Sequence, residues 1–185
     1  MDISLYEGKL DSVINTKTYI RRIKEVERIH ADEQLLAEEY NSLSRNITKS
    51  GIFTDSIMYW WIGEADRLKR MENNSNKDKQ YMASRLLRNI FNIHIGLGDR
   101  FYETKQYPFA IFSYKICCSS MPNIKYSYYA LACAQALSNN STAACRTLEK
   151  LIELGFKNKK SIESEPAFIA LKNNKRYLSI IKSLE

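Results

Sequence analysis

Two consecutive stretches of equal length decide the fold of this chain. Residues 91–124 read FNIHIGLGDRFYETKQYPFAIFSYKICCSSMPNI, and residues 125–158 read KYSYYALACAQALSNNSTAACRTLEKLIELGFKN. A shift of 34 residues superposes them. The matched pairs are Leu97 with Leu131, Gly98 with Ala132, Ala110 with Ala144, and Cys117 with Leu151. Because small residues at matched positions let antiparallel helices cross closely, the recurrence predicts two stacked helical pairs.

The first stretch carries a specific pattern of large and small residues. Its members are Leu97, Gly98, Phe101, Tyr107, Ala110, Tyr114 and Pro122. At these spacings they resemble a tetratricopeptide repeat (TPR). The second stretch is similar but degenerate, since Gln135 takes the place of Phe101 and Phe156 stands where proline is usual. Residues 129–137, 148–156 and 164–168 resemble the closing repeats of bacterial TPR proteins, in which two short helices (here 166–171 and 175–184) cap the array.

The resemblance implies an all-α fold, a TPR-like solenoid of helical hairpins with a long N-terminal helix and a short C-terminal helical cap. We expect a long helix in residues 1–50 and a helical pair in residues 51–90. That pair is a degenerate repeat, because Asn76 stands where a small residue is expected. Residues 91–158 form the two TPR-like repeats, and residues 159–185 form the cap.

Apolar periodicity predicts the N-terminal helix. From Thr18 to about Ile47, apolar residues recur mostly at three- and four-residue steps, which lines one face of an amphipathic helix. The stripe consists of Tyr19, Ile23, Val26, Ile29, Leu36, Tyr40, Leu43 and Ile47. Gly51 ends this helix.

The other helices follow from capping and turn residues. A second helix begins near residues 54–56, and its buried residues are predicted to be Ile57, Trp60, Trp61, Ala65 and Leu68. A third helix is expected over residues 78–105, and Pro108 opens a fourth that ends before Pro122. A fifth spans about Lys125 to Leu137, followed by a sixth that Ser141 caps and Gly155 terminates. No stretch is typical of a strand.

Composition and charge favour a globular protein. Of the 185 residues, 44% are hydrophobic and 26% charged, and no apolar run is long enough to cross a membrane. The formal charge is +7, but the basic residues are interleaved with acidic ones. The densest basic excess is Lys157, Lys159 and Lys160, which we place in a loop. A solvated basic surface is therefore favoured over a nucleic-acid footprint.

The four cysteines favour buried thiols over disulfides or metal ligands. Cys117 and Cys118 are adjacent, and neither they nor Cys133 and Cys145 form a C-x-x-C pair. Free thiols point weakly to the cytoplasm. A periplasmic location stays open if a leader or an upstream domain precedes Met1.

We predict no catalytic, cofactor-binding or metal-binding residues. His94 occupies a position where TPR helices place a packing residue, and His30 lies one helical turn before Glu33 without a second ligand. Gly96 and Gly98 follow no strand, so they do not form a phosphate loop. We expect one ring of Trp60-Trp61 in the core and the other at an interface.

A solenoid presents the first helix of each pair on its inner face. The resemblance therefore predicts a partner-binding groove lined by Asn92, Asp99, Tyr102 and Tyr126. Asp99 favours a ligand with a local positive charge. For Tyr126 the sequence supports two interpretations equally, a place in the groove and packing on the cap. Tyr129 is expected to pack on the cap. The long N-terminal helix offers a competing arrangement, in which it fills the groove itself.

The sequence thus favours a non-catalytic scaffold module of bacterial TPR type, which binds a protein or peptide. One alternative is a C-terminal accessory or oligomerisation domain of a longer bacterial hydrolase, and a homo-oligomer is compatible with the sequence. The other alternative is a basic nucleic-acid-associated regulator, which the interleaved charges do not favour.

Overall fold

A computed structural model describes the backbone of residues 3–184 and the side chains of residues 17–184. Within that part of the chain every regular element is helical, so the predicted all-α class is confirmed. The elements are α1 (Ile3–Ser50), α2 (Asp55–Glu72), α3 (Lys77–Glu103), α4 (Tyr107–Ser120), α5 (Lys125–Leu137), α6 (Ser141–Glu153), α7 (Lys159–Ser164), the 3-10 helix η1 (Pro166–Leu171) and α8 (Lys175–Lys182).

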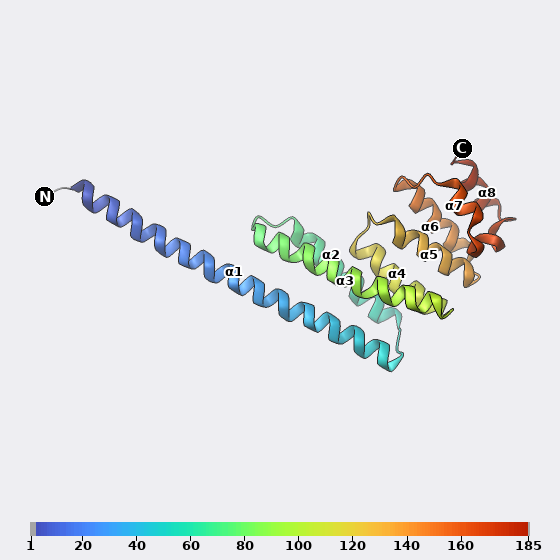
Figure 1. Ribbon diagram of the computed structural model, residues 1–185, viewed down its shortest axis with the longest axis horizontal. Coiled ribbons are helices and arrows are strands. Elements are labelled where there is room, and N and C mark those ends of the chain that lie inside the picture. The colour runs from blue at the N-terminus through green and yellow to red at the C-terminus, as the bar shows by residue number, and fades with distance from the viewer. Residues whose placement is uncertain (1–2, 185) are drawn as a thin grey trace.

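Helices that follow one another in sequence pack against one another from α2 to α6. Helix α3 packs on both α2 and α4, and residues 90 and 91, the predicted boundary between two repeats, lie within it without a break. Helix α1 runs beside α3, and its N-terminal part stands clear of the other helices (Figure 1). Helices α7, η1 and α8 gather at the C-terminal end of the molecule (Figure 1).

Side-chain caps explain where several helices begin. Thr54 caps α2, as expected, by accepting a hydrogen bond from the Ile57 amide at 3.4 Å. The prediction that Ser141 caps α6 is wrong, because Asn140 Oδ1 accepts from the Ala143 amide at 3.1 Å. Asparagine at this position makes the same bond as serine, one residue earlier.

The loop predicted around Lys159 and Lys160 is also wrong, since both residues belong to α7. Asn158 caps this helix through a 3.0 Å bond from the Ser161 amide to its Oδ1. The helix also buries Ile162 completely in the C-terminal core. A cap and one apolar anchor are therefore enough to order this short basic segment.

The crossing of α3 and α4 depends on Gly98. A Cβ atom at Gly98 would lie 2.5 Å from Cε1 of the Tyr114 ring, so no larger residue fits without a shift. Ala110, Ala132 and Ala144 are each fully buried, as their predicted place at helix crossings requires. The small residues picked out by the recurrence thus lie inside the molecule.

The N-terminal core joins α1 to α2, α3 and α4. Tyr40 of α1 packs edge-on against Trp61 of α2, with the ring centroids 5.5 Å apart. Trp61 in turn contacts His94 of α3 at 4.7 Å between ring centroids, and both residues are at most 1% exposed. Burial lowers the pKa of His94 to about 3, so the imidazole is neutral in the folded protein.

Three residues predicted to be buried are instead exposed. Trp60 is 48% exposed and rests its edge on Tyr40 and Trp61. Tyr19 and Ile23 of α1 are 66% and 40% exposed, whereas Ile29 is buried. The apolar stripe continues along α1 beyond the helices that would cover it, because α1 is much longer than the α2–α3 pair (Figure 1).

Polar contacts fix the part of α1 that lies on the body. Arg85 of α3 donates two hydrogen bonds of 2.6 Å to the Glu33 carboxylate, and Asn76 Nδ2 donates to Glu25 Oε1 at 3.0 Å. Tyr40 also donates to Glu64 of α2. Glu33 lies one helical turn after His30, and its ion-pair partner is Arg85.

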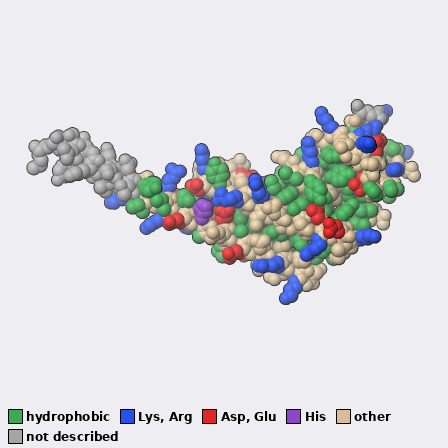
Figure 2. Space-filling model, in the orientation of Figure 1, with side chains coloured by type: hydrophobic (Ala, Val, Ile, Leu, Met, Phe, Trp, Pro, Cys, Tyr) green, Lys and Arg blue, Asp and Glu red, His purple; other side chains and the backbone are tan. Residues whose placement is uncertain are grey.

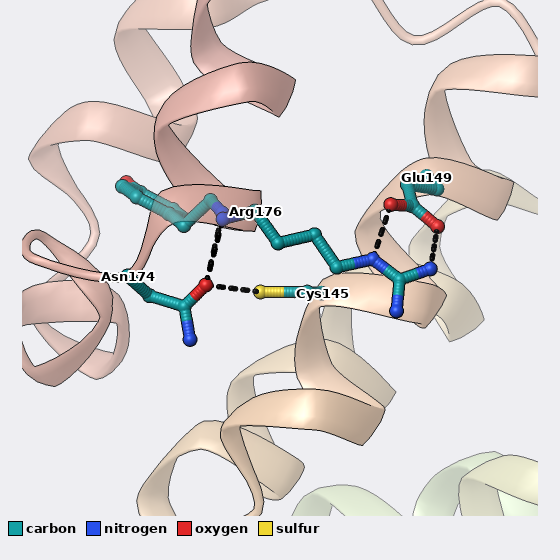
Figure 3. A network of polar contacts seen from close by, with 5 residues as sticks. Cys145, Glu149, Asn174 and Arg176 are labelled. Atoms are coloured by element: carbon teal, nitrogen blue, oxygen red, sulfur yellow. Dashed lines mark hydrogen bonds and ion pairs between the residues drawn. The ribbon is translucent and has the colours of Figure 1, made fainter.

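The C-terminal cap is tied to α6 by one polar network (Figure 3). Arg176 of α8 forms a two-bond ion pair with Glu149 of α6. Asn174 caps α8 by accepting from the Arg176 amide at 2.9 Å, and it also accepts a long contact from the Cys145 thiol. The last helix is therefore held by side chains of α6 and by its own capping residue.

All four cysteines are free thiols, as predicted. Cys117, Cys133 and Cys145 are buried and Cys118 is half-buried. Burial raises the pKa of each thiol, that of Cys118 to about 12. These side chains pack as small hydrophobes.

Candidate functional site

Helices α4 and α5 bring two phenol hydroxyls to one carboxylate oxygen on α3. The Tyr114 hydroxyl donates a hydrogen bond of 2.8 Å to Asp99 Oδ1, and the Tyr126 hydroxyl donates one of 3.0 Å to the same atom. Of the four predicted groove residues, Asp99 and Tyr126 are thus in direct contact. Tyr126 is still 54% exposed, so its ring is presented to solvent.

Gly98 makes this arrangement possible. Since Gly98 has no side chain, the ring of Tyr114 lies directly against the backbone of α3. The hydroxyl at the end of that ring then reaches the next residue, Asp99. The residue that sets the helix crossing also positions the carboxylate's first partner.

Tyr102 lies nearly one turn after Asp99 on α3 and is half-buried. Its ring packs edge-on against Tyr107, with centroids 5.8 Å apart. Burial raises the pKa of its hydroxyl above the usual range, and the nearby Cys133 and Glu165 raise it further. Tyr102 contacts the hydrophobic cores on both sides of it, so it supports the fold as well as lining the surface.

Tyr129 packs on the C-terminal cap, as expected. Its hydroxyl is 3.1 Å from the Ser161 carbonyl oxygen and 2.9 Å from Glu165 Oε2. Its ring faces Phe168 at 5.9 Å between centroids. Tyr126 makes no such contact, and its hydrogen bond goes to Asp99 instead.

We define the tyrosine cluster as Tyr102, Tyr114, Tyr126 and Tyr129 together with the carboxylates of Asp99 and Glu165. Burial raises the pKa of every one of the four phenols, and hydrogen bonding to Asp99 adds to the shift of Tyr126, to about 12. The phenols therefore keep their protons at neutral pH and act as hydrogen-bond donors. Such a surface offers aromatic area, hydroxyl groups and negative charge.

Asn92 is not part of this cluster. It is exposed on α3, seven residues before Asp99, which corresponds to roughly 10 Å along the helix. The structure thus brings together two predicted residues, Asp99 and Tyr126, with Tyr102 beside them. Asn92 lies on the same helix but apart from them.

Comparison of the chain with models of protein families, with characterised proteins and with solved structures finds no match. The candidate site therefore has to be interpreted from its own geometry.

Sequence reasoning missed two members of the cluster as polar groups. Tyr114 was identified only as a member of the repeat pattern, and Glu165 only as part of the stretch 164–168 that resembles a closing repeat. Glu165 in fact caps η1 through the Ala167 amide and also accepts the Tyr129 hydroxyl. The sequence did contain a usable signal, the presence of both Gly98 and Tyr114 in the repeat pattern. A tyrosine ring that packs against a glycine on the facing helix places its hydroxyl beside the residue next to that glycine, here Asp99.

Figure 2 shows hydrophobic side chains gathered over the C-terminal half of the visible face, with a small group of acidic side chains among them. In the part of the chain that the structure describes, histidines, cysteines and carboxylates do not gather in threes as metal ligands would. Over the same residues, none of the helices combines the length and apolar character needed to cross a bilayer.

Proposed function

We propose that this chain is a TPR-type scaffold that binds a protein or peptide through the tyrosine cluster, and that the bound segment carries positive charge. The observation that carries the proposal is the Asp99 carboxylate, held by two phenols at 2.8 and 3.0 Å on one oxygen. That arrangement orients a negative group at a surface otherwise made of aromatic rings.

The free side of the carboxylate suits a cationic donor. Within residues 17–184, no group donates a hydrogen bond to Asp99 Oδ2, so this oxygen is available to a lysine, an arginine or a backbone amide of a ligand. Glu103 is near enough to Tyr126 to raise the pKa of its hydroxyl, and it adds to the negative charge of the site. Although the chain as a whole has a formal charge of +7, this local acidic surface is complementary to a basic segment.

Tyr126 supplies the contact area. Its ring is 54% exposed, and its hydroxyl is fixed by Asp99. An aromatic side chain held in place loses little conformational entropy when a partner covers it. Exposed, pre-positioned tyrosines are common among the residues that contribute most to binding.

The TPR part of the proposal rests on the recurrence and on helix packing. The 34-residue shift matches α3 with α5 and α4 with α6, and helices α3 to α6 pack in sequence order. The close contact at Gly98 lies where the repeat pattern places a small residue. These features support two helical hairpins, with the tyrosine cluster between the first helices of each.

Binding can be tested without knowing the natural partner. Random dodecapeptides displayed on phage are selected on the full chain, and the enriched peptides are measured by fluorescence anisotropy. We expect basic peptides, and we expect Tyr126→Ala to weaken them by about 1–2 kcal/mol. Asp99→Asn should also weaken the binding of these peptides, and the affinity that remains should depend less on salt concentration.

The control is Tyr81→Ala, which removes a 59% exposed tyrosine from the beginning of α3, the helix that carries Asp99. It should leave the affinity within twofold of the wild type. Enrichment of acidic or uncharged peptides, or equal binding to the Tyr126→Ala and Tyr81→Ala variants, would contradict the proposal. Circular dichroism of each variant checks that helicity is unchanged.

The exposed face of α1 favours a second candidate, the oligomerisation domain. Tyr19, Ile20 and Ile23 are 66%, 48% and 40% exposed in the N-terminal half of α1. Contiguous apolar residues of this kind mark association surfaces. Sedimentation velocity of the wild type and of Ile20→Glu tests it, because a concentration-independent monomer in both would reject this role.

A further inference from the structure

The side of α3 that faces away from the tyrosine cluster forms a second hollow with α1. The two helices leave an open cleft of about 940 Å³ between them. Arg45 and Lys49 of α1 and Arg100 of α3 line it, and Ile93 and Leu97 of α3 line it as well. We call it the α1–α3 cleft.

The cations of this cleft have no ionic partner among the side chains that the structure describes. Arg45, Lys49 and Arg100 are all exposed and are absent from every ion pair of residues 17–184. By contrast, Arg67 of α2 and Arg85 of α3 are each paired with a glutamate at 2.6 Å. Positive charge is therefore left over at the cleft.

The spacing of these cations favours an anionic occupant. Arg45 and Lys49 are four residues apart on one helical face, where like charges repel. Arg100 faces the same hollow from α3. Its guanidinium lies 5.9 Å from the centre of the Phe101 ring, so it is partly positioned by an aromatic contact. An anion between the two helices would offset all three charges.

The α3 wall adds an apolar component. Ile93 and Leu97 are one helical turn apart, and each remains partly exposed. A ligand that matches both components carries acidic groups and at least one apolar side chain. None of the residues that line the cleft is aromatic, so it has no ring on which a nucleic-acid base could stack. Glu38 also lines the cleft, so its lining side chains carry three cations and one carboxylate.

We propose that the α1–α3 cleft binds an acidic peptide segment of a partner protein. Carboxylates of that segment pair with Arg45, Lys49 and Arg100, and an apolar side chain packs on Ile93 and Leu97. The site goes beyond the tyrosine cluster in place and in charge, because it lies on the other side of α3 and selects the opposite sign. A chain with both sites can hold two segments at once.

The test uses the full chain and a fluorescein-labelled decapeptide made of Glu, Asp and Leu. Anisotropy titrations compare it with a Lys/Leu peptide of equal length and with single-stranded DNA of equal charge. The expected order of affinity is acidic peptide, then DNA, then basic peptide at this site, and salt should weaken acidic-peptide binding. The double variant Arg45→Glu/Arg100→Glu should weaken it at least about tenfold.

The matched control is Arg28→Glu/Lys115→Glu, which makes the same change in net charge at two exposed cations outside the cleft. It should change the affinity less than threefold. Lys49→Glu alone should give an intermediate loss, which keeps the test decisive if the double variant unfolds. The Tyr126→Ala variant should bind the acidic peptide as the wild type does. Failure of the proposed cleft can therefore be distinguished from failure of the proposed binding at the tyrosine cluster.

Three outcomes would overturn the proposal. The first is that the acidic peptide fails to bind, and the second is an equal loss in the cleft and control variants, which indicates only a general effect of net charge. The third is tighter binding of DNA than of the peptide with the same dependence on Arg45 and Arg100, which would make the cleft a nucleic-acid site.

Discussion

The two sides of α3 carry charges of opposite sign, and the two sets of charges differ in how many protein groups contact them. On one side, Asp99 is held by two phenols, so its charge is oriented by the protein itself. On the other side, Arg45, Lys49 and Arg100 face a common cleft without an ion-pair partner among the described residues. The carboxylate of Asp99 is therefore held in one orientation by the protein, whereas the cations of the cleft are free to pair with a ligand.

The difference follows from what packs against each side. Helices α4 and α5 approach α3 closely because Gly98 allows it, so their tyrosines can reach Asp99. Helix α1 contacts α3 at Glu33 and α2 at Tyr40, and its residues from Glu38 to Lys49 line a cleft with α3. Close helix packing produces internal hydrogen bonds, whereas divergent helices leave charges for a ligand.

The largest effect is expected at the close side. Gly98→Ala places a Cβ 2.5 Å from the buried Tyr114 ring, whereas Gly96→Ala, in the same helix, meets nothing within 4 Å. Both changes gain the same helix propensity, so the difference in their free energies of unfolding isolates overpacking and should be roughly 1–3 kcal/mol. Urea denaturation measures it, and equal stability of the two variants would show that Tyr114 moves freely.

The next effect concerns the core beneath α1. Since burial lowers the pKa of His94 to about 3, the unfolded chain binds one more proton than the folded one between that pH and about 6.5. Stability is therefore full above pH 6.5 and falls as the pH drops, by roughly 1 kcal/mol between pH 7.5 and 5.5. Urea midpoints at both pH values should show this loss in the wild type but not in His94→Phe. A loss of the same size in both would assign it to other groups.

A smaller effect tests how far the phenols hold Asp99. Tyr114→Phe removes the 2.8 Å hydrogen bond while keeping the ring, and it should cost about 1 kcal/mol of stability. Tyr126→Phe removes the 3.0 Å bond at an exposed position and should cost less than half of that. Thermal denaturation of the pair gives the ranking. The reverse order would mean that Tyr126, not Tyr114, orients the carboxylate.

The smallest effect is expected where α1 is tied to α3. Arg85→Ala removes the ion pair with Glu33, and because the arginine is 49% exposed the cost should be only about 0.2–1 kcal/mol. The loss should be greatest at low salt, since the pair is screened. Arg88→Ala, an exposed arginine nearly one turn on, serves as the comparison and should have no effect. A loss above 2 kcal/mol would show that this pair governs the docking of α1.

Local signals in the sequence were enough to predict much of the fold. The predicted fifth helix has the bounds of α5, Lys125–Leu137, and the small residue at Gly98 lies at a close crossing. These features depend on residues that lie close together in the sequence. The repeat pattern also selected Asp99 and Tyr126, which the structure joins by a hydrogen bond.

The failures concern relations between distant elements. The exposure of Tyr19 depends on how far α1 extends past α2 and α3, and that of Trp60 on how α2 packs against Tyr40 of α1. Periodicity within one helix encodes neither relation. Likewise, the α1–α3 cleft combines Arg45 with Arg100, two residues that no local pattern connects. The role of Tyr114 as a donor to Asp99 required the distance between two helices.

The buried thiols can report the order in which parts of the molecule open. A thiol with a raised pKa reacts with alkylating reagents only when its surroundings open, because the thiolate is the reactive form. Cys117 lies on α4, Cys133 on α5 and Cys145 on α6, so each reports the opening of a different helix. The order in which mass spectrometry finds them modified gives the sequence of local unfolding events along the chain, without a foreign label.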